Sequence, residues 1–171
     1  VQIQNPGQDW VTVGYFAYEV PDGSRIDLPR YPQPLQANAV RYIGDRLYVA
    51  GYGNVDNLTS ARFEIFNVSI PQVPIRISSL PLLHDSKPTG LEIVDDLAVV
   101  GLADGTLSLI SIFDETLPVV AEEVPLGGSI TGMDADGRRV VVSSTNTSQP
   151  LTLIDLETEP LSIQPITTVG I

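Results

Sequence analysis

The sequence predicts an all-β protein, a β-propeller of four-stranded antiparallel blades with three complete blades and a partial one. Three observations predict this fold class. Short apolar runs rich in β-branched residues alternate with turns that contain Asp and Gly. Four such runs form a unit at residues 90–126, and similar units precede and follow it in the sequence. The recurrence has a period of about 40 to 50 residues, which is typical of propeller blades.

The unit 90–126 shows how each blade is built. Asp95-Asp96 separates its first two apolar runs, and Ala103-Asp104-Gly105 separates the second run from the third. Such joints are typical of tight hairpins, because Asp and Gly tolerate the backbone conformations that these turns require. A longer joint, 114–118, precedes the fourth run, 119–124. We therefore interpret the Asp residues of these joints as turn formers rather than ligands.

The spacing of corresponding residues supports three copies. Phe63, Leu107 and Leu151 open the third run of each unit and are 44 residues apart twice. Aligning the second runs gives a similar period. They open at Leu47, Leu97 and Val140, with steps of 50 and 43 residues.

These spacings divide the chain into a partial blade, 1–34, and three blades, 35–83, 84–127 and 128–171. A β-sandwich is the alternative, since it also contains short strands between regular turns. It does not predict a third-run pattern at a fixed period. Propellers usually have 4 to 8 blades, so two resolutions are open. The N-terminal strands and residues 167–171 could complete a fourth blade and close a small ring, or the chain could be a segment of a longer polypeptide or one of several chains that close a ring. We favour the segment.

The third runs also resemble a known repeat. They read Phe63-Glu-Ile-Phe-Asn-Val68, Leu107-Ser-Leu-Ile-Ser-Ile112 and Leu151-Thr-Leu-Ile-Asp-Leu156, each followed by a polar stretch and a Pro. With the hairpin segment Leu47-Tyr-Val-Ala50, they resemble the LVIVD-type repeat, although only Asp155 keeps the Asp of that pattern. The resemblance implies a β-propeller, often in secreted or surface-anchored bacterial and archaeal proteins, and no catalytic residues.

Composition excludes several classes of function. The chain has no Cys, so it has neither disulfides nor thiolate zinc sites. Its net charge is −12. Residues 1–87 hold 8 acidic and 7 basic side chains, whereas residues 88–171 hold 13 acidic and only 2 basic side chains. This balance argues against nucleic acid as a partner, because phosphate binding requires Lys and Arg. No apolar run reaches the roughly 18 residues of a membrane span. A cation or a basic partner is the natural complement.

Two groups of residues are candidate ligand contacts. Arg41, Glu92 and Asp134 lie on the first runs, which line the channel of a propeller. This trio offers a ligand funnel but no catalytic mechanism. The second group, Tyr52, Asn54 and Asp56, lies on the variable loop 52–60. A second variable loop spans 143–150, and we expect function to lie in these two loops.

Other chemical features have simpler interpretations. His84, the only histidine, is expected on a surface loop, and Glu122-Glu123 on a solvated outer strand. Asp134-Ala-Asp136-Gly137 resembles the start of a calcium loop, but the distal Glu is missing, so a hairpin turn is favoured over calcium. We predict neither a catalytic site nor another cofactor. The aromatic side chains are expected to pack between blades rather than to form a binding platform; they include Tyr42, Tyr48 and Tyr52.

Two functions remain open. The favoured one is a non-catalytic interaction or scaffold module of a larger extracellular or cell-surface prokaryotic protein. It would bind a protein or a glycan through the loops of one propeller face, with the remaining blades supplied by a longer chain or by another chain. The alternative is a segment of a propeller enzyme, whose channel-lining active site is completed by other blades.

Overall fold

The computed structural model describes residues 2–3, 11–12, 35–55, 58–157 and 162–166. The chain divides into two compact units, Val1–Pro34 and Leu35–Ile171. In the first unit, β1 (Gln2–Ile3) pairs antiparallel with β2 (Val11–Thr12). The rest of the predicted partial blade lies outside the described residues.

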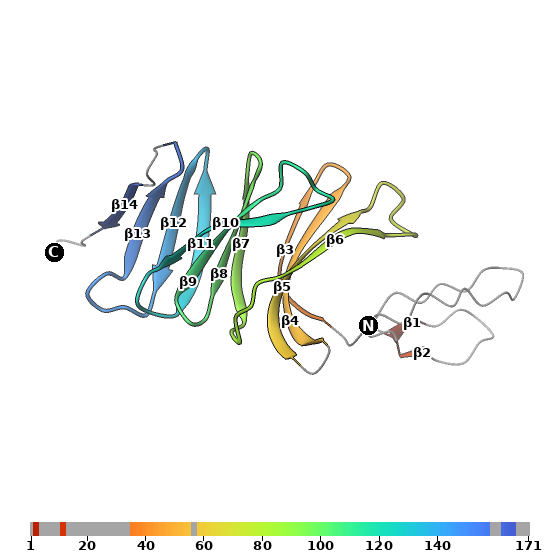
Figure 1. Ribbon diagram of the computed structural model, residues 1–171, viewed down its shortest axis with the longest axis horizontal. Coiled ribbons are helices and arrows are strands. Elements are labelled where there is room, and N and C mark those ends of the chain that lie inside the picture. Colours follow the sequence, from red (N-terminus) through yellow and green to blue (C-terminus); the bar gives the residue numbers. More distant parts are fainter. Residues whose placement is uncertain (1, 4–10, 13–34, 56–57, 158–161, 167–171) are drawn as a thin grey trace, which may run out of the picture. The chain divides into compact units, whose positions relative to one another are not determined.

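The second unit contains three four-stranded antiparallel sheets, each with its strands in sequence order (Figure 1). Blade 1 consists of β3 (Gln36–Ile43), β4 (Arg46–Val55), β5 (Leu58–Asn67) and β6 (Ile75–Pro81). Blade 2 consists of β7 (Pro88–Val94), β8 (Leu97–Leu102), β9 (Thr106–Ser111) and β10 (Val119–Pro125). Blade 3 consists of β11 (Ile130–Asp136), β12 (Arg139–Ser144), β13 (Leu151–Asp155) and β14 (Ser162–Ile166). The described residues include no helix, which confirms the all-β class.

The first hairpin of every blade has a two-residue turn. The residue after the first strand has a positive φ in all three: 58° at Gly44, 50° at Asp95 and 57° at Gly137. Gly adopts this region freely, and Asp is among the residues that tolerate it. Asp95 therefore occupies a glycine-like turn position, which confirms that the Asp residues of this joint form a turn.

The strand register defines which residues correspond between blades. Each hairpin turn is followed directly by the first residue of the second strand, namely Arg46, Leu97 or Arg139. Four residues further on, the second strand pairs with Phe63, Leu107 or Leu151. The spacing of 44 residues between third strands is thus confirmed. The second-strand alignment through Leu47, Leu97 and Val140 is wrong by one residue in blades 1 and 3, because the turn fixes the register.

Alternate residues of a strand point to opposite faces of its sheet. Each blade therefore has a preceding face, toward the blade before it, and a following face, toward the blade after it. Between blades 1 and 2, one buried cluster joins the two faces. The following face of blade 1 contributes Tyr48, Ala50, Phe63 and Ile65, and the preceding face of blade 2 contributes Leu91, Ala98, Val100, Ile110 and Ile112.

The interface between blades 2 and 3 repeats this arrangement with corresponding residues. The following face of blade 2 contributes Val99, Leu107 and Leu109, and the preceding face of blade 3 contributes Val140, Val142, Ile154 and Leu156. Most of these side chains are fully buried; Val99, Leu107, Val140 and Ile154 have 0% exposure. The core of the protein therefore lies between blades.

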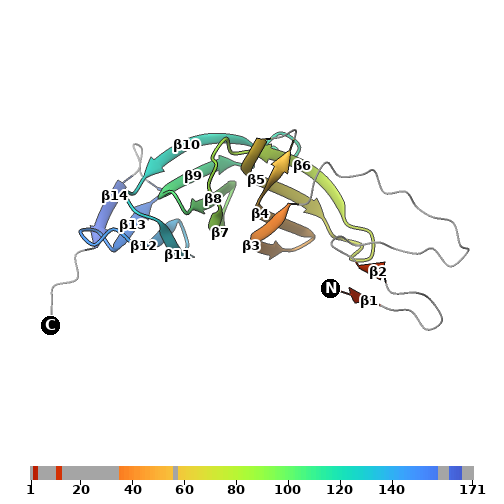
Figure 2. The same ribbon diagram turned by 90° about the horizontal axis from the view of Figure 1, so that it is seen from below.

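Contacts between blades are concentrated at the innermost strands. β7 contacts both β3 and β11, and Figure 2 shows these three strands on the same side of their sheets. Sheets that meet along their first strands form a propeller-type arrangement rather than a two-layer sandwich. The described blades do not close a ring. No helix in the described ranges is long and apolar enough to cross a membrane.

Candidate functional site

The three predicted channel residues occupy corresponding positions on the innermost strands. Arg41 pairs with Tyr48, Glu92 with Val99 and Asp134 with Val141. Arg41 Nε donates to Glu92 Oε2 at 2.9 Å, and Arg41 Nη2 makes a second contact with Glu92 Oε1. The hydrogen bond to Glu92 raises the pKa of Arg41 against the effect of burial, and the charges of Glu92 and Asp134 add to it. The structure thus places Arg41 in contact with Glu92, whereas Asp134 acts on Arg41 only through its charge.

Within this row of three residues on the innermost strands, Arg41 and Glu92 form a structural ion pair. The Glu92 side chain is only 10% exposed, whereas that of Arg41 is 43% exposed. A two-point contact between guanidinium and carboxylate fixes the orientation of both groups. Since Arg41 belongs to blade 1 and Glu92 to blade 2, the pair joins two neighbouring blades. Neither group is placed as a general acid or base, because each compensates the charge of the other.

The predicted loop contacts are only partly described. The Tyr52 hydroxyl donates to Asp85 Oδ1, which belongs to the segment between β6 and β7. This hydrogen bond is the main cause that raises the pKa of Tyr52. Asn54 lies on β4, with its side chain outside the described part, and Asp56 lies outside the described residues. Tyr52 therefore anchors the connection between blades 1 and 2.

His84 contacts two carboxylates that the sequence did not associate with it. Its Nδ1 lies 3.0 Å from Asp104 Oδ2, and its Nε2 lies 2.9 Å from Glu123 Oε1. Ionised carboxylates only accept hydrogen bonds, so both contacts are satisfied when the imidazole carries a proton on each nitrogen. Burial lowers the pKa of His84, but the hydrogen bonds to Glu123 and Asp104 outweigh it and raise the pKa above 6.5. His84 thus fastens the segment between blades 1 and 2 to blade 2.

The His84 cluster is not arranged around one ion. Its two carboxylates lie on opposite ring nitrogens, so no single point is close to all three groups. Within the described ranges, no group of three His, Cys, Asp or Glu side chains could hold a metal. At the calcium-like segment, β11 ends at Asp136 and the hairpin turn follows at Gly137, as the turn interpretation predicts.

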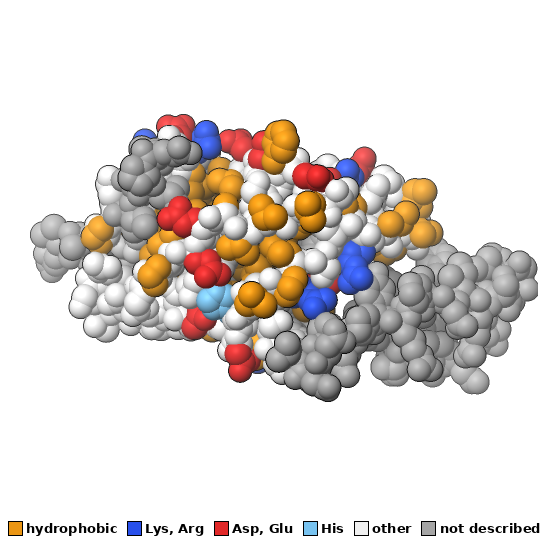
Figure 3. Space-filling model, in the orientation of Figure 1, with side chains coloured by type: hydrophobic (Ala, Val, Ile, Leu, Met, Phe, Trp, Pro, Cys, Tyr) orange, Lys and Arg blue, Asp and Glu red, His pale blue; other side chains and the backbone are white. Residues whose placement is uncertain are grey.

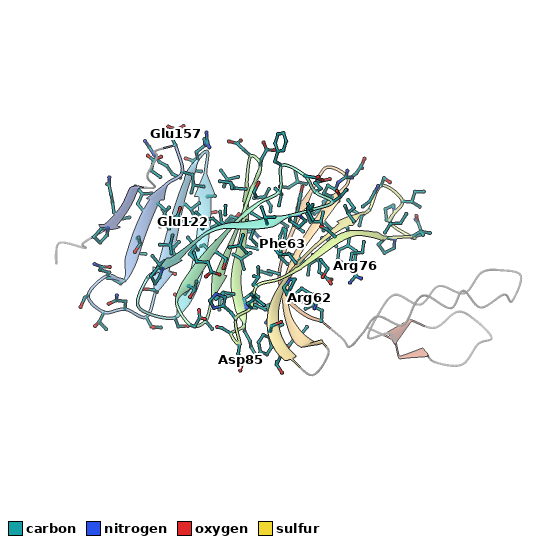
Figure 4. The ribbon with its side chains drawn as sticks, viewed as in Figure 1. Arg62, Phe63, Arg76, Asp85, Glu122 and Glu157 are labelled. Carbon is teal, nitrogen blue, oxygen red and sulfur yellow. The ribbon has the colours of Figure 1, made fainter. Side chains whose placement is uncertain are left out.

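The blades have two distinct edges where their strands end. One edge, which we call the turn edge, is formed by residues 44–45, 69–74, 95–96, 113–118 and 137–138. The linker edge is formed by residues 82–87, 103–105, 126–129 and 145–150. Figure 4 shows Glu157, which follows β13, near one edge and Asp85 at the other. The predicted loop 52–60 is wrong, because β4 continues to Val55 and pairs with β5 from Leu58 onward. Of the predicted loop 143–150, residues 145–150 connect β12 to β13 at the linker edge.

The turn edge contains an open hollow between blades 1 and 2. Its volume is about 580 Å³, and it is lined by Tyr48, Asp95, Asp96, Ile112, Phe113, Asp114, Glu115 and Thr116. At its base, Glu115 accepts hydrogen bonds from Arg46 Nε at 2.6 Å and from the Tyr48 hydroxyl at 3.0 Å. Burial, together with the hydrogen bond to Glu115, raises the pKa of Tyr48 to about 12. These bonds hold the loop 113–118 of blade 2 against β4 of blade 1.

Large apolar side chains are exposed on the turn-edge loops. Phe113 is 83% and Leu117 71% exposed in blade 2, and Ile70 is 60% and Val73 55% exposed in blade 1. Figure 3 shows hydrophobic side chains beside acidic ones along this edge. This surface lies outside the segments 52–60 and 143–150, where the sequence predicted function. The available signal was the presence of apolar residues at turn positions outside the strand pattern.

Of the three tyrosines predicted to pack between blades, one is buried there, one is half-buried and one is exposed. Tyr48 is 7% exposed and stacks with Phe63, with ring centroids 6.3 Å apart, which confirms its prediction. Tyr42 is 67% exposed, so its prediction is wrong. Tyr52 is half-buried and hydrogen-bonded. Tyr42 lies on the preceding face of blade 1, where none of the described blades covers it.

Searches with the sequence found no match among protein-family models or curated proteins. Comparison of the structure found similar folds. The chain resembles the computationally designed Ika8 protein with a TM-score of 0.54 and 16% identity over 77% of this chain and 37% of that one. It resembles the designed Ika4 protein with a TM-score of 0.51 and 17% identity, over 80% of this chain and 74% of that one. It resembles Raptor from Chaetomium thermophilum with a TM-score of 0.57 and 15% identity, over 75% of this chain and 12% of that one.

At these identities, the similarities show the fold alone. The chain spans about a third of the Ika8 protein and about an eighth of Raptor. The fold and the site together define an all-β protein of blade-type repeats with an apolar turn edge.

Proposed function

We propose that this chain is a non-catalytic interaction module of a larger extracellular or cell-surface protein, similar to LVIVD-type repeat proteins. In this proposal, it binds a protein partner at the turn edge. The observation that carries it is the exposure of Phe113, Leu117 and Ile70 on neighbouring turn-edge loops. Exposed apolar surface of this kind is typical of binding sites on soluble proteins.

The charges around these side chains favour a basic protein segment over a glycan. Asp95, Asp96 and Asp114 line the hollow beside Phe113. Arg138 lies 3.4 Å from Asp95 and compensates part of this charge. An aromatic anchor beside carboxylates suits a peptide that carries both apolar and basic side chains. The remaining blades of the ring come, in this proposal, from a longer chain or from another chain.

Selection from a displayed random peptide library tests the proposal. We expect the chain to select peptides that contain both apolar and basic residues. Phe113→Ser should weaken their binding at least about tenfold, because central aromatic anchors contribute most to such interfaces. Leu83→Ser is the matched control, since Leu83 is 88% exposed at the linker edge. Equal binding by both variants, or selection of glycans but no peptides on an array, would overturn the proposal.

A further inference from the structure

Met133, the only methionine of the chain, lies at the interface between blades 2 and 3. It belongs to β11, the innermost strand of blade 3, and packs against the buried cluster that joins the two blades. Its side chain fills a slot left open by two glycines of blade 2. A Cβ atom at Gly90 would lie 2.3 Å from Met133 Cγ, and one at Gly101 would lie 2.8 Å from Met133 Sδ. Because carbon atoms in contact are about 3.5 to 4.0 Å apart, the slot exists only where both residues lack a side chain.

The interface between blades 1 and 2 fills the corresponding slot with different residues. Leu91 corresponds to Met133, since each is the fourth residue of its innermost strand. In blade 1, Ala39 pairs with Ala50 as the two glycines pair with each other in blade 2. Leu91 packs in one cluster with both alanines. One interface thus combines leucine with two alanines, and the other combines methionine with two glycines.

We propose that Met133 is an oxidation-sensitive wedge, whose conversion to the sulfoxide by a peroxide loosens the interface between blades 2 and 3. In this reaction the thioether sulfur attacks one peroxide oxygen, the S–O bond forms and the O–O bond breaks. The second oxygen leaves as water, so sulfur is oxidised and the peroxide is reduced. Met133 is half-buried, which leaves part of the side chain in contact with solvent and with a molecule as small as hydrogen peroxide.

The slot accommodates the thioether but not the sulfoxide. Oxidation adds an oxygen atom to a sulfur that already fills the space between the two glycines, and it makes an apolar side chain polar. The cluster that Met133 joins consists of hydrophobic residues, and a buried polar oxygen without a hydrogen-bond donor is costly. The sulfoxide therefore leaves the slot, and β11 separates from β7. This proposal does not rest on the proposed function, whose site lies at the turn edge between blades 1 and 2.

Hydrogen peroxide applied to the folded full chain tests the proposal. We expect the intact mass to increase by a single oxygen atom, and peptide mapping to place that atom on Met133. Hydrogen exchange of the oxidised chain should become at least about fivefold faster in β11 and β12, and should change less in β4 and β5 of blade 1. A folded chain that takes up no oxygen at Met133 overturns the proposal. Uptake without faster exchange in β11 and β12 overturns it as well.

Met133→Leu is the matched variant, because it copies Leu91 of the neighbouring interface. Its hydrogen exchange should be the same before and after peroxide treatment. If this variant does not fold, Gly90→Ala and Gly101→Ala are added to it, so that the whole slot copies the one between blades 1 and 2. Peroxide that accelerates exchange in the folded leucine variant as much as in wild type overturns the assignment to Met133. Methionine sulfoxide reductases of both stereospecificities should restore slow exchange in the oxidised wild type, and removal of the oxygen without this recovery contradicts a reversible wedge.

Discussion

Blade 2 and its neighbours are built from the same pattern but differ in burial. Blade 2 is covered on both faces, and its Val99 and Leu107 are fully buried. The corresponding residues of blade 3, Val141 and Leu151, lie on a face with no described neighbour and retain exposure. The comparison shows that the repeat specifies two apolar faces for every blade, and that a neighbouring blade deepens the burial of a face. Val49, on the preceding face of blade 1, is still only 7% exposed without a described neighbour.

The largest expected effect compares corresponding core residues. Leu107→Ala should lower the free energy of unfolding by about 2 to 5 kcal/mol, because it leaves a cavity between blades 2 and 3. Leu151→Ala should cost about 1 kcal/mol or less, since part of that side chain is already in contact with water. Urea unfolding measures both. Equal losses would contradict the difference between covered and uncovered faces.

The next effect concerns the inner row of charged residues. Glu92→Gln should destabilise the chain by about 1 to 2 kcal/mol, because the nearly buried carboxylate bonds to Arg41 across the interface of blades 1 and 2. Asp134→Asn is the matched control at the corresponding position of blade 3. It should change stability by less than about 0.5 kcal/mol, as exposed surface substitutions usually do. The same unfolding measurement would reject the interpretation if both variants behaved alike.

Two tyrosines provide a smaller comparison. Tyr48→Phe removes a hydrogen bond to Glu115 and should cost about 1 kcal/mol, whereas Tyr42→Phe, at a side chain that is 67% exposed, should be neutral. Glu115→Gln should also lower the pKa of Tyr48 from about 12, because a negative acceptor beside the phenol is lost. Ultraviolet titration of the tyrosinate reports this change. An unaltered titration would show that Glu115 does not control Tyr48.

The smallest effect is the pH dependence introduced by His84. Its pKa is higher in the folded chain than 6.5, so its protonated form stabilises the fold below pH 6.5, and this contribution is lost as the pH rises through the folded value. The difference in stability between wild type and His84→Gln should therefore be present just below pH 6.5 and vanish at higher pH. Partial solvation of these groups limits it to less than about 1 kcal/mol. Thermal unfolding over this pH range would contradict the assignment if the difference grew with pH.

Local pattern predicted much of the fold. Asp and Gly joints identified the hairpins, and the spacing from Phe63 to Leu107 to Leu151 identified corresponding third strands. The repeat also placed Arg41 beside Glu92, because corresponding positions on adjacent inner strands are neighbours in space. What local pattern cannot show is which faces are covered. Tyr42 and its counterpart Ile93 both have the pattern of a buried residue, and of the two only Ile93 has a described blade against it.

The site depended on longer-range contacts. Asp104 and Glu123 lie 20 and 39 residues from His84 in the sequence, and only the antiparallel order of blade 2 brings them to one edge. The turn-edge surface lies outside the segments 52–60 and 143–150, for which the sequence predicted function because of their length. Phe113 and Leu117 stand between β9 and β10, at positions where no strand buries them.

Native-state hydrogen exchange, resolved by strand, tests most directly whether neighbouring blades determine burial and stability. In dilute solution, the amides of β8 and β9 should exchange most slowly, because both faces of blade 2 are covered, and those of β12 and β13 should exchange faster. Equal protection of β8, β9, β12 and β13 would contradict the account.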